Sequence, residues 1–325
     1  MAGGTQYLFA VGRVKAKEEE IIDAGMWQRL IDAEPDEALR LLKDHGYGES
    51  GEEASAEAMI ASEMTKTAKF IAEISPEPAF TDLFLFPIDG YNLKLMLKGI
   101  VMRKDVTPHL REGGAIAIQR LQRAVESDAF DGLPKAFARA IKTLETETDA
   151  RVISTVVDQA VYDAILDVLS EKKHDNALLK RYFKASIDHT NILSVIRAGA
   201  LGYDEKAVSR LLIDGGDMDK AKLLSAVSDS EDHGALALAG AAAEDGVKKA
   251  LARYAERPNI GMLEQALDRA SLSIISSARG DVFGIAPLLY FRLMKEREGK
   301  MLRMLFAAKR GNVPITAAEL GVKEA

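Results

Sequence analysis

The sequence predicts an all-α protein, because helical spacing of apolar residues recurs along the chain and whole segments repeat. Prolines and glycine pairs separate the helical segments, and no run of residues alternates between apolar and polar as a half-buried strand would. We therefore expect helical bundles joined by short loops.

Two pairs of segments carry the repeat. Residues 110–132 align with residues 212–234 at an offset of 102, with a pair of adjacent glycines in each copy. Residues 89–98 (DGYNLKLMLK) align with residues 188–197 (DHTNILSVIR) at an offset of 99. The two offsets agree on a repeat of about a hundred residues.

A third and weaker copy follows at residues 287–296 (PLLYFRLMKE), where the aspartate and asparagine of the other copies are lost but the apolar spacing survives. On this basis we predict three similar helical-bundle units of about 100 residues each. Their predicted boundaries are 1–105, 106–203 and 204–325.

Each unit contains an amphipathic helix with apolar residues at i, i+3, i+4, i+7 and i+8, which form one stripe along the helix. In the first two units these positions are Leu93, Met96, Leu97, Ile100 and Val101, and Ile192, Val195, Ile196, Gly199 and Ala200. In the third unit the stripe runs through Phe291, Met294, Met301 and Leu305, and Glu298 and Gly299 interrupt it.

Composition excludes several classes of protein. The 325 residues are 47% hydrophobic and 29% charged, which fits neither a disordered polymer nor an integral membrane protein, and no run approaches the roughly 18 apolar residues of a membrane span. The absence of cysteine removes disulfides, thiolate nucleophiles and cysteine-ligated zinc, and fits a reducing cytoplasm. The net charge of −7 argues against a general nucleic-acid binder.

One local exception to the acidic balance is the segment 292–310, in which seven Lys or Arg accompany two Glu. We expect a solvated helix face there, since runs of charge usually face water. A docking surface for an acidic partner is the alternative.

The search for chemical motifs finds no catalytic, cofactor or metal site. Residues 46–51 form a literal GxGxxG, but they follow a helical pattern rather than a strand and precede two glutamates, so we interpret them as a helix-ending loop. The run that starts at Asp229 resembles a calcium loop but has the wrong residues at its third and twelfth positions. The five histidines show no metal-ligand spacing.

Two polar pairs recur at the same place in two units: Asp89 with Asn92, and Asp188 with Asn191. The i, i+3 spacing places both members of a pair on one helix face. Asp89 follows Pro87 and could cap a helix, an interpretation that fits Asp188 less well. The pairs either make a buried helix-to-helix hydrogen bond or line an interior surface, and we favour the structural role because most such polar groups satisfy backbone or neighbours.

Four segments carry a resemblance to a known family. They are the start YLFAVGRVKAKE (residues 7–18), the repeated helix at 89–98, the segment YFKASIDHTNILSVIR (182–197) and the late stretch 287–310. With these segments the sequence resembles, nearly end to end, the C subunit of archaeal and bacterial A/V-type ATPases, the counterpart of the d subunit of eukaryotic V-ATPases. Gly12 stands where that family more often has a better helix former.

The resemblance implies a funnel with pseudo-threefold repetition and a non-catalytic role as central-stalk adaptor. In that role the protein links the rotary shaft of the soluble head to the membrane proteolipid ring and transmits torque. It would be a monomer when isolated, present in one copy per complex, on the cytoplasmic face of the membrane but not inserted in it, without a cofactor. From the residues alone, a generic α-helical repeat scaffold for other protein partners is the alternative function.

We also predict a set of partner-facing residues. Lys98 and Arg197 occupy equivalent positions at the ends of the two best-matched repeat segments, each directly after an apolar stripe residue. The full predicted set is Asp89, Asn92, Lys98, Asp188, Asn191, Arg197, Lys295 and Arg297.

Overall fold

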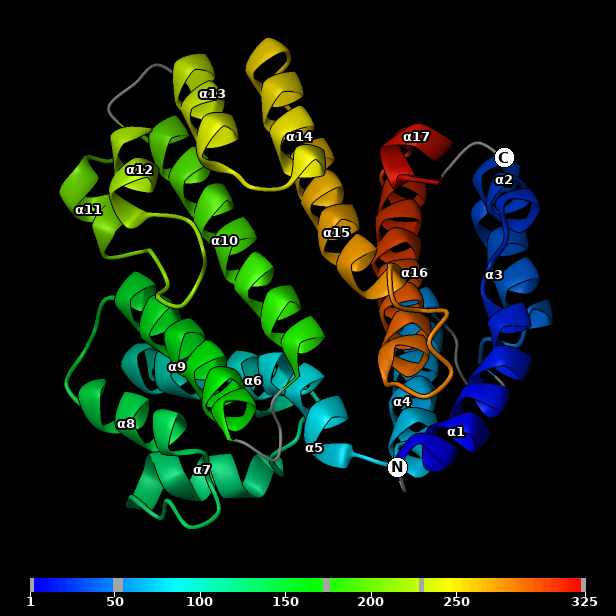
Figure 1. Ribbon diagram of the computed structural model, residues 1–325, viewed down its shortest axis with the longest axis horizontal. Helices are drawn as coiled ribbons and strands as arrows, with labels where there is room; N and C mark the ends of the chain where they lie inside the picture. Colours follow the sequence, from blue (N-terminus) through cyan, green and yellow to red (C-terminus); the bar gives the residue numbers. More distant parts are fainter. Residues whose placement is uncertain (1–2, 49–54, 172–175, 228–230, 323–325) are drawn as a thin grey trace. The chain divides into compact units, whose positions relative to one another are not determined.

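The structure is a computed structural model, which describes residues 3–48, 55–171, 176–227 and 231–322 (Figure 1). All regular structure in these ranges is α-helix or short 3₁₀ helix, without a strand, which confirms the predicted all-α class. The chain divides into two compact units. Unit 1 contains Met1–Pro78 together with Ile275–Ala325, and unit 2 contains Ala79–Ile274.

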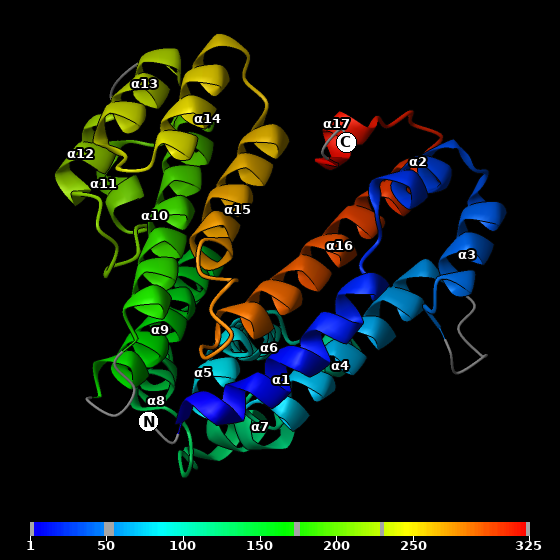
Figure 2. The same ribbon diagram turned by 45° about the vertical axis from the view of Figure 1, so that its right-hand side comes forward.

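Unit 1 joins the two ends of the sequence. Its elements are α1 (Gly3–Lys17), η1 (Glu18–Glu20), α2 (Ala24–Asp32), α3 (Pro35–Asp44), α4 (Ala56–Ile74), α16 (Ala286–Arg310) and α17 (Ala317–Leu320). The long helices α4 and α16 lie side by side, and α1 packs on α16 (Figures 1 and 2).

Local signals explain where the helices of unit 1 begin. The carboxylate of Asp23 accepts a hydrogen bond from the Met26 backbone N–H at 2.7 Å and caps α2, and Ser55 caps α4 in the same way. Pro35 occupies the first position of α3, where no backbone N–H is required. The core between these helices and α16 is apolar and includes Trp27, Leu30, Leu42, Ile60, Leu302 and Leu305.

Unit 2 contains two sets of helices in sequence order. The first is α6 (Phe86–Met102), α7 (Ile118–Ser127), α8 (Lys135–Thr143) and α9 (Ala150–Ser170), preceded by the short α5 (Pro78–Thr81) and η2 (Asp82–Phe84), with η3 (Thr107–His109) in the loop after α6. The second is α10 (Ala177–Ala200), α11 (Glu205–Ser209), α12 (Lys220–Ser225), α13 (Glu231–Ala241), α14 (Asp245–Glu256) and most of α15 (Ile260–Ser276).

Each set in unit 2 packs on its own long helices. Helix α6 lies against α9, and α9 against α8, around side chains such as Leu93, Phe137 and Val157. In the second set α10 supplies Ile192, Val195 and Ile196 to a core that it shares with α11 to α15. The division into three units at 1–105, 106–203 and 204–325 stays a prediction, as does the funnel.

The predicted stripes are only partly buried. In α6 the first three members are buried, but Ile100 and Val101 in the last turn are exposed; in α10 the last two members, Gly199 and Ala200, are exposed as well. In α16 the interrupted stripe nevertheless continues the packed side. Glu298 and Gly299 are both buried on the packed side of the helix, because Glu298 has partners there.

Candidate functional site

The polar pair on α6 binds the backbone of the loop that leads to α7. The Asn92 carboxamide donates to the carbonyl oxygen of Arg111 and accepts from its N–H, both at 2.8 Å. The Asp89 carboxylate accepts from the N–H groups of Ala115 at 3.0 Å and Ile116 at 3.1 Å. Both polar side chains are fully buried. We call this arrangement a loop clamp.

The same loop clamp occurs on α10, where it holds the loop that leads to α12. Asn191 donates to the Ile213 carbonyl at 2.9 Å and accepts from its N–H at 2.8 Å. Asp188 accepts from the N–H groups of Asp217 and Met218, both at 3.0 Å. The helix segments repeat at an offset of 99 and the loop segments at an offset of 102, and together they form one contact that occurs twice.

The loop dictates which residue types can form a clamp. In each clamp the two N–H donors bind separate carboxylate oxygens, whereas a carboxamide has only one oxygen to offer. A carbonyl beside an N–H needs one donor and one acceptor, which the carboxamide offers and an ionised carboxylate does not. This explains the order Asp then Asn in both copies. The structural role that we favour is confirmed, but the bonds run from helix to loop backbone and not from helix to helix as expected. The alternative that Asp89 is an N-cap is wrong, since α6 begins at Phe86.

Each clamp contains a pair of glycines at the point where the loop passes close to the aspartate. A Cβ on Gly114 would lie 2.0 Å from Oδ1 of Asp89, and a Cβ on Gly216 would lie 2.1 Å from Oδ1 of Asp188. The preceding glycines, Gly113 and Gly215, have φ of 88° and 104°, a region that favours glycine. The repeated Gly-Gly of the sequence is thus part of the clamp.

Burial changes the acidity of both clamp carboxylates. It raises the pKa of Asp89 to about 7, although the two backbone N–H donors oppose the change. Burial raises the pKa of Asp188 as well, against the hydrogen bonds from Met218 and Asp217.

Unit 1 contains a buried ionic cluster formed by Lys295, Glu298, Glu63 and Tyr47. The Lys295 ammonium lies 2.6 Å from Oε1 of Glu298 and 2.9 Å from Oε1 of Glu63, and its side chain is 1% exposed. The Tyr47 hydroxyl also donates to Glu298. Burial raises the pKa of Tyr47, followed in effect by the charge of Glu298, so this hydroxyl keeps its proton and remains a donor.

The ionic cluster holds a loop, as the clamps of unit 2 do. Oε2 of Glu298 accepts from the Ile22 N–H at 2.6 Å, and the Lys295 ammonium donates to the Glu20 carbonyl at 3.3 Å. This loop leads to α2. A lysine and a glutamate one turn apart on α16 therefore bind a backbone carbonyl and a backbone N–H of the segment before the next short helix.

Sequence reasoning missed three members of the cluster. Tyr47 stands out in the sequence only as part of the GxGxxG run, and Glu298 only as an interruption of a stripe. A usable signal exists for Glu298, because a charged residue at a stripe position of a helix is expected to be buried and therefore paired. Glu63 gives no comparable signal in its own segment.

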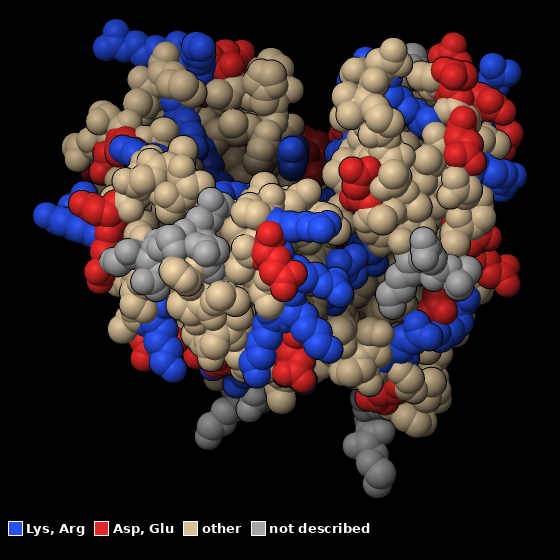
Figure 3. Space-filling view, turned by 90° about the horizontal axis from the view of Figure 1, so that it is seen from above, with Lys and Arg blue, Asp and Glu red and all other residues tan. Residues whose placement is uncertain are grey.

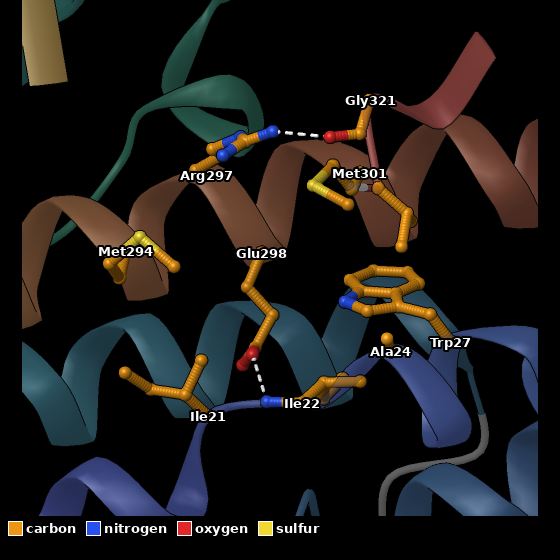
Figure 4. A pocket seen from close by; sticks show the side chains of 10 residues that line it. Ile21, Ile22, Ala24, Trp27, Met294, Arg297, Glu298, Met301 and Gly321 are labelled. Atoms are coloured by element: carbon orange, nitrogen blue, oxygen red, sulfur yellow. Dashed lines mark hydrogen bonds between the residues drawn. The ribbon is translucent and has the colours of Figure 1, made fainter. Parts of the chain in front are cut away.

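Arg297, also on α16, lies at the edge of a cavity of about 240 Å³ (Figure 4). Its guanidinium donates to the carbonyl of Gly321, which ends α17. The side chains of Trp27, Met294 and Met301 make the lining mainly apolar. Arg297 thus fastens the C-terminal helix of unit 1 to α16.

Lys98 and Arg197 both have partners within unit 2. The Lys98 ammonium donates to Oγ of Ser154 at 2.6 Å, and burial, followed by the nearby Lys94, lowers the pKa of Lys98. Arg197 forms an ion pair with Glu264 on α15, and both side chains are exposed. That these two residues and the other six of the predicted set contact a partner stays a prediction.

The basic segment 292–310 is only in part the solvated face that we expected, with Lys300, Arg303 and Arg310 exposed. Arg292 and Lys295 are buried, and Lys309 donates to backbone carbonyls of the α2 end, Ile31 and Ala33. The segment holds unit 1 together, since its long side chains reach acceptors on α2 and α4. On the face seen in Figure 3, basic and acidic side chains are interspersed.

The remaining motifs lie partly outside the residues that the structure describes. Gly46, Tyr47 and Gly48 form the turn that ends α3, as predicted, and residues 49–51 of the GxGxxG run lie outside the described residues. Of the calcium-like run, Asp229 and Ser230 lie outside them too, and Glu231 begins α13. Among the described residues, no cluster of His, Asp and Glu could hold a metal ion. No described helix is long and apolar enough to cross a bilayer.

Comparison with known proteins gives one consistent result. Residues 10–317 match the family model described as ATP synthase (C/AC39) subunit. The chain is 24% identical to the C subunit of the A-type ATP synthase of Methanosphaera stadtmanae, over 94% of this chain and 84% of that protein. It is 23% identical to the C subunit of the V-type sodium ATPase of Enterococcus hirae, over 92% of both chains. It is 22% identical to the C subunit of the A-type ATP synthase of Halorubrum lacusprofundi, over 94% of both.

Proposed function

The chain belongs to the ATP synthase (C/AC39) subunit family, and from this premise we propose that it is the central-stalk adaptor of an A/V-type ATPase. Members of this family are a structural rather than a catalytic part of that complex. In this role the protein binds the rotary shaft of the soluble head and the proteolipid ring of the membrane, and transmits torque between them. It sits on the cytoplasmic face, in one copy per complex.

The observation that carries the proposal is the extent of the family match. Residues 10–317 take in helices of both compact units, so the resemblance is not confined to one motif. The loop clamps add a mechanical argument. A part that transmits torque must resist deformation, and a loop whose backbone groups are tied to a long helix by side-chain hydrogen bonds is stiffer than a solvated one.

Co-purification tests the proposal. A tagged chain expressed with the other ATPase subunits should bring down the shaft subunits and, in mild detergent, the ring, with one adaptor per ring. Removal of the adaptor should leave ATP hydrolysis by the soluble head but abolish ion transport that depends on it. A chain that binds neither shaft nor ring while remaining folded would contradict the proposal and favour the general helical scaffold.

A further inference from the structure

The long helices α6, α10 and α16 end in the same cap. In each, a backbone N–H beyond the helix donates to a carbonyl five residues earlier: Lys104 to Gly99 at 3.0 Å, Tyr203 to Ala198 at 3.0 Å and Val313 to Ala308 at 2.9 Å. The residue before that donor has a left-handed backbone in all three cases, with φ of 51° at Arg103, 71° at Gly202 and 54° at Asn312. This is the arrangement of a Schellman cap.

The cap of α6 carries an unsuitable residue. Glycine adopts the left-handed region without steric cost, and asparagine is tolerated there because its short polar side chain can bond locally. Arginine has neither advantage. Since the chain uses Gly202 and Asn312 at the equivalent places, folding does not require Arg103, and strained residues of this kind are retained most often where they serve a function.

The residues just before the caps of α6 and α10 also differ, in the apolar side chains that they expose. At the end of α6, Ile100, Val101 and Met102 are 59%, 39% and 54% exposed. At the end of α10, the first two equivalent positions are Gly199 and Ala200, and only Leu201 is large and apolar. The end of α6 therefore carries three exposed apolar side chains, an apolar ridge, whereas the equivalent positions on α10 carry one large apolar side chain, Leu201, which is 69% exposed.

A hollow and a positive charge accompany this ridge. A cavity of about 400 Å³ lies between the end of α6 and α7, with Met96, Val106, Leu110 and Val125 in its lining and Glu126 and Asp105 also on it. Between Lys98 and Arg111 the sequence has four cations and one carboxylate, in a chain with a net charge of −7. Arg103 and Lys104 are exposed, and neither forms an ion pair with a described residue.

We propose that residues 100–104, the α6 tip, are a docking surface for an acidic, partly apolar segment of another protein subunit. Apolar side chains of the partner would cover the ridge and enter the hollow, and its carboxylates would meet Arg103 and Lys104. Only the identification of the partner as a subunit of the same ATPase rests on the proposed function.

Arg103→Gly separates binding from folding. Glycine adopts the left-handed backbone of the cap without strain, so the variant should melt at a higher temperature than the parent. Its affinity for the shaft and ring subunits should fall about tenfold, because a cation is lost. Lys104→Glu should weaken the same binding further. Added salt should reduce the affinity of this variant less than it reduces the affinity of the parent, because the variant has less charge attraction to screen. Asn312→Gly is the matched control, since it changes the equivalent cap on α16 and should leave affinity unchanged.

A photo-crosslinking side chain placed at Met102 in the assembled complex identifies the partner segment, with the same group at Leu201 as control. Crosslinking at Met102 but not at Leu201, to a segment that contains Asp or Glu beside apolar residues, supports the proposal. Equal crosslinking at both sites, crosslinking to lipid, or unchanged affinity of Arg103→Gly overturns it. If the chain assembles with shaft and ring but Met102 reaches neither, the docking surface is wrong and the adaptor function stands.

Discussion

Units 1 and 2 hold a similar kind of loop by different chemistry. In unit 2, Asp89 with Asn92 and Asp188 with Asn191 bind the loops that lead to α7 and α12, and their partners in these bonds are backbone groups. In unit 1, Lys295 and Glu298 bind the loop that leads to α2, and they also pair with each other.

The difference lies in how the buried charge is compensated in each unit. A carboxylate of a unit 2 clamp is stabilised by two backbone N–H donors, whereas the ionic cluster places one ammonium against two buried carboxylates. Each member of an ionic cluster depends on the others, because a buried charge without its partner is costly. A clamp made of backbone hydrogen bonds loses only the bonds of the residue that is changed.

The largest effect should come from Lys295→Met. This change leaves Glu63 and Glu298 buried without their cation, and we expect the free energy of unfolding to fall by about 3–5 kcal/mol. Urea unfolding at neutral pH measures it. Arg303→Met on the same helix is the control, since its ion pair with Glu57 is exposed and should contribute at most about 1 kcal/mol. A loss no larger than that of the control would remove the contrast between the units.

The two clamps of unit 2 should respond alike. Asn92→Ala and Asn191→Ala each leave a loop carbonyl and N–H without a partner, so each should lower the free energy of unfolding by about 1–3 kcal/mol. The same urea experiment, with both variants side by side, measures the pair. A difference between them larger than about 1 kcal/mol would mean that the matching geometry does not carry matching energy.

The pH dependence of the stability of unit 2 gives a further comparison. The folded-state pKa of Asp89 is raised to about 7 from an ordinary value of 3.8, so this group contributes most to stability below about pH 4, and the contribution is lost as the pH rises through 7. The stability of the parent relative to Asp89→Asn should therefore decrease between about pH 4 and pH 7. Asp188→Asn should show the same sign. A constant difference across that range would show that the hydrogen bonds outweigh burial.

The smallest effect on folding should come from Lys98→Glu combined with Arg197→Glu. Arg197 and Glu264 are exposed and Lys98 gives up one hydrogen bond, so the melting temperature should change little. If these residues face an acidic partner, assembly with shaft and ring should weaken, and added salt should weaken it less than it weakens assembly of the parent. Normal folding with unchanged affinity would exclude both residues from the interface, and a large loss of stability would assign them to the fold.

Much of unit 2 was predictable from the sequence, and much of unit 1 was not. The clamps were visible because the same residues recur at fixed offsets, 99 and 102, although nothing in the sequence indicated that the Asp-Asn pairs and the Gly-Gly pairs touch. The ionic cluster has no second copy for comparison among the described residues. Two of its members, Tyr47 and Lys295, are 248 residues apart, and such a long-range pairing leaves no local pattern.

The exposed end of α6 illustrates a second limit. Periodicity correctly predicted a helix through Ile100 and Val101, but it assumed that the packed side continues to the last turn. Whether a neighbour covers a helix end depends on the path of the following loop, here set by the left-handed residue Arg103. An arginine in that conformation has no sequence signature.

The union of both chain ends in unit 1 bears on synthesis at the ribosome. Residues 79–274 can complete unit 2 as they emerge, but Met1–Pro78 must wait for α16, whose Leu302 and Leu305 complete the core around Trp27 and Leu42. At about 5–20 residues per second, this delay is on the order of tens of seconds. During that time the apolar faces of α2, α3 and α4 lack their cover, so we expect the nascent N-terminal segment to be exposed to aggregation until α16 emerges.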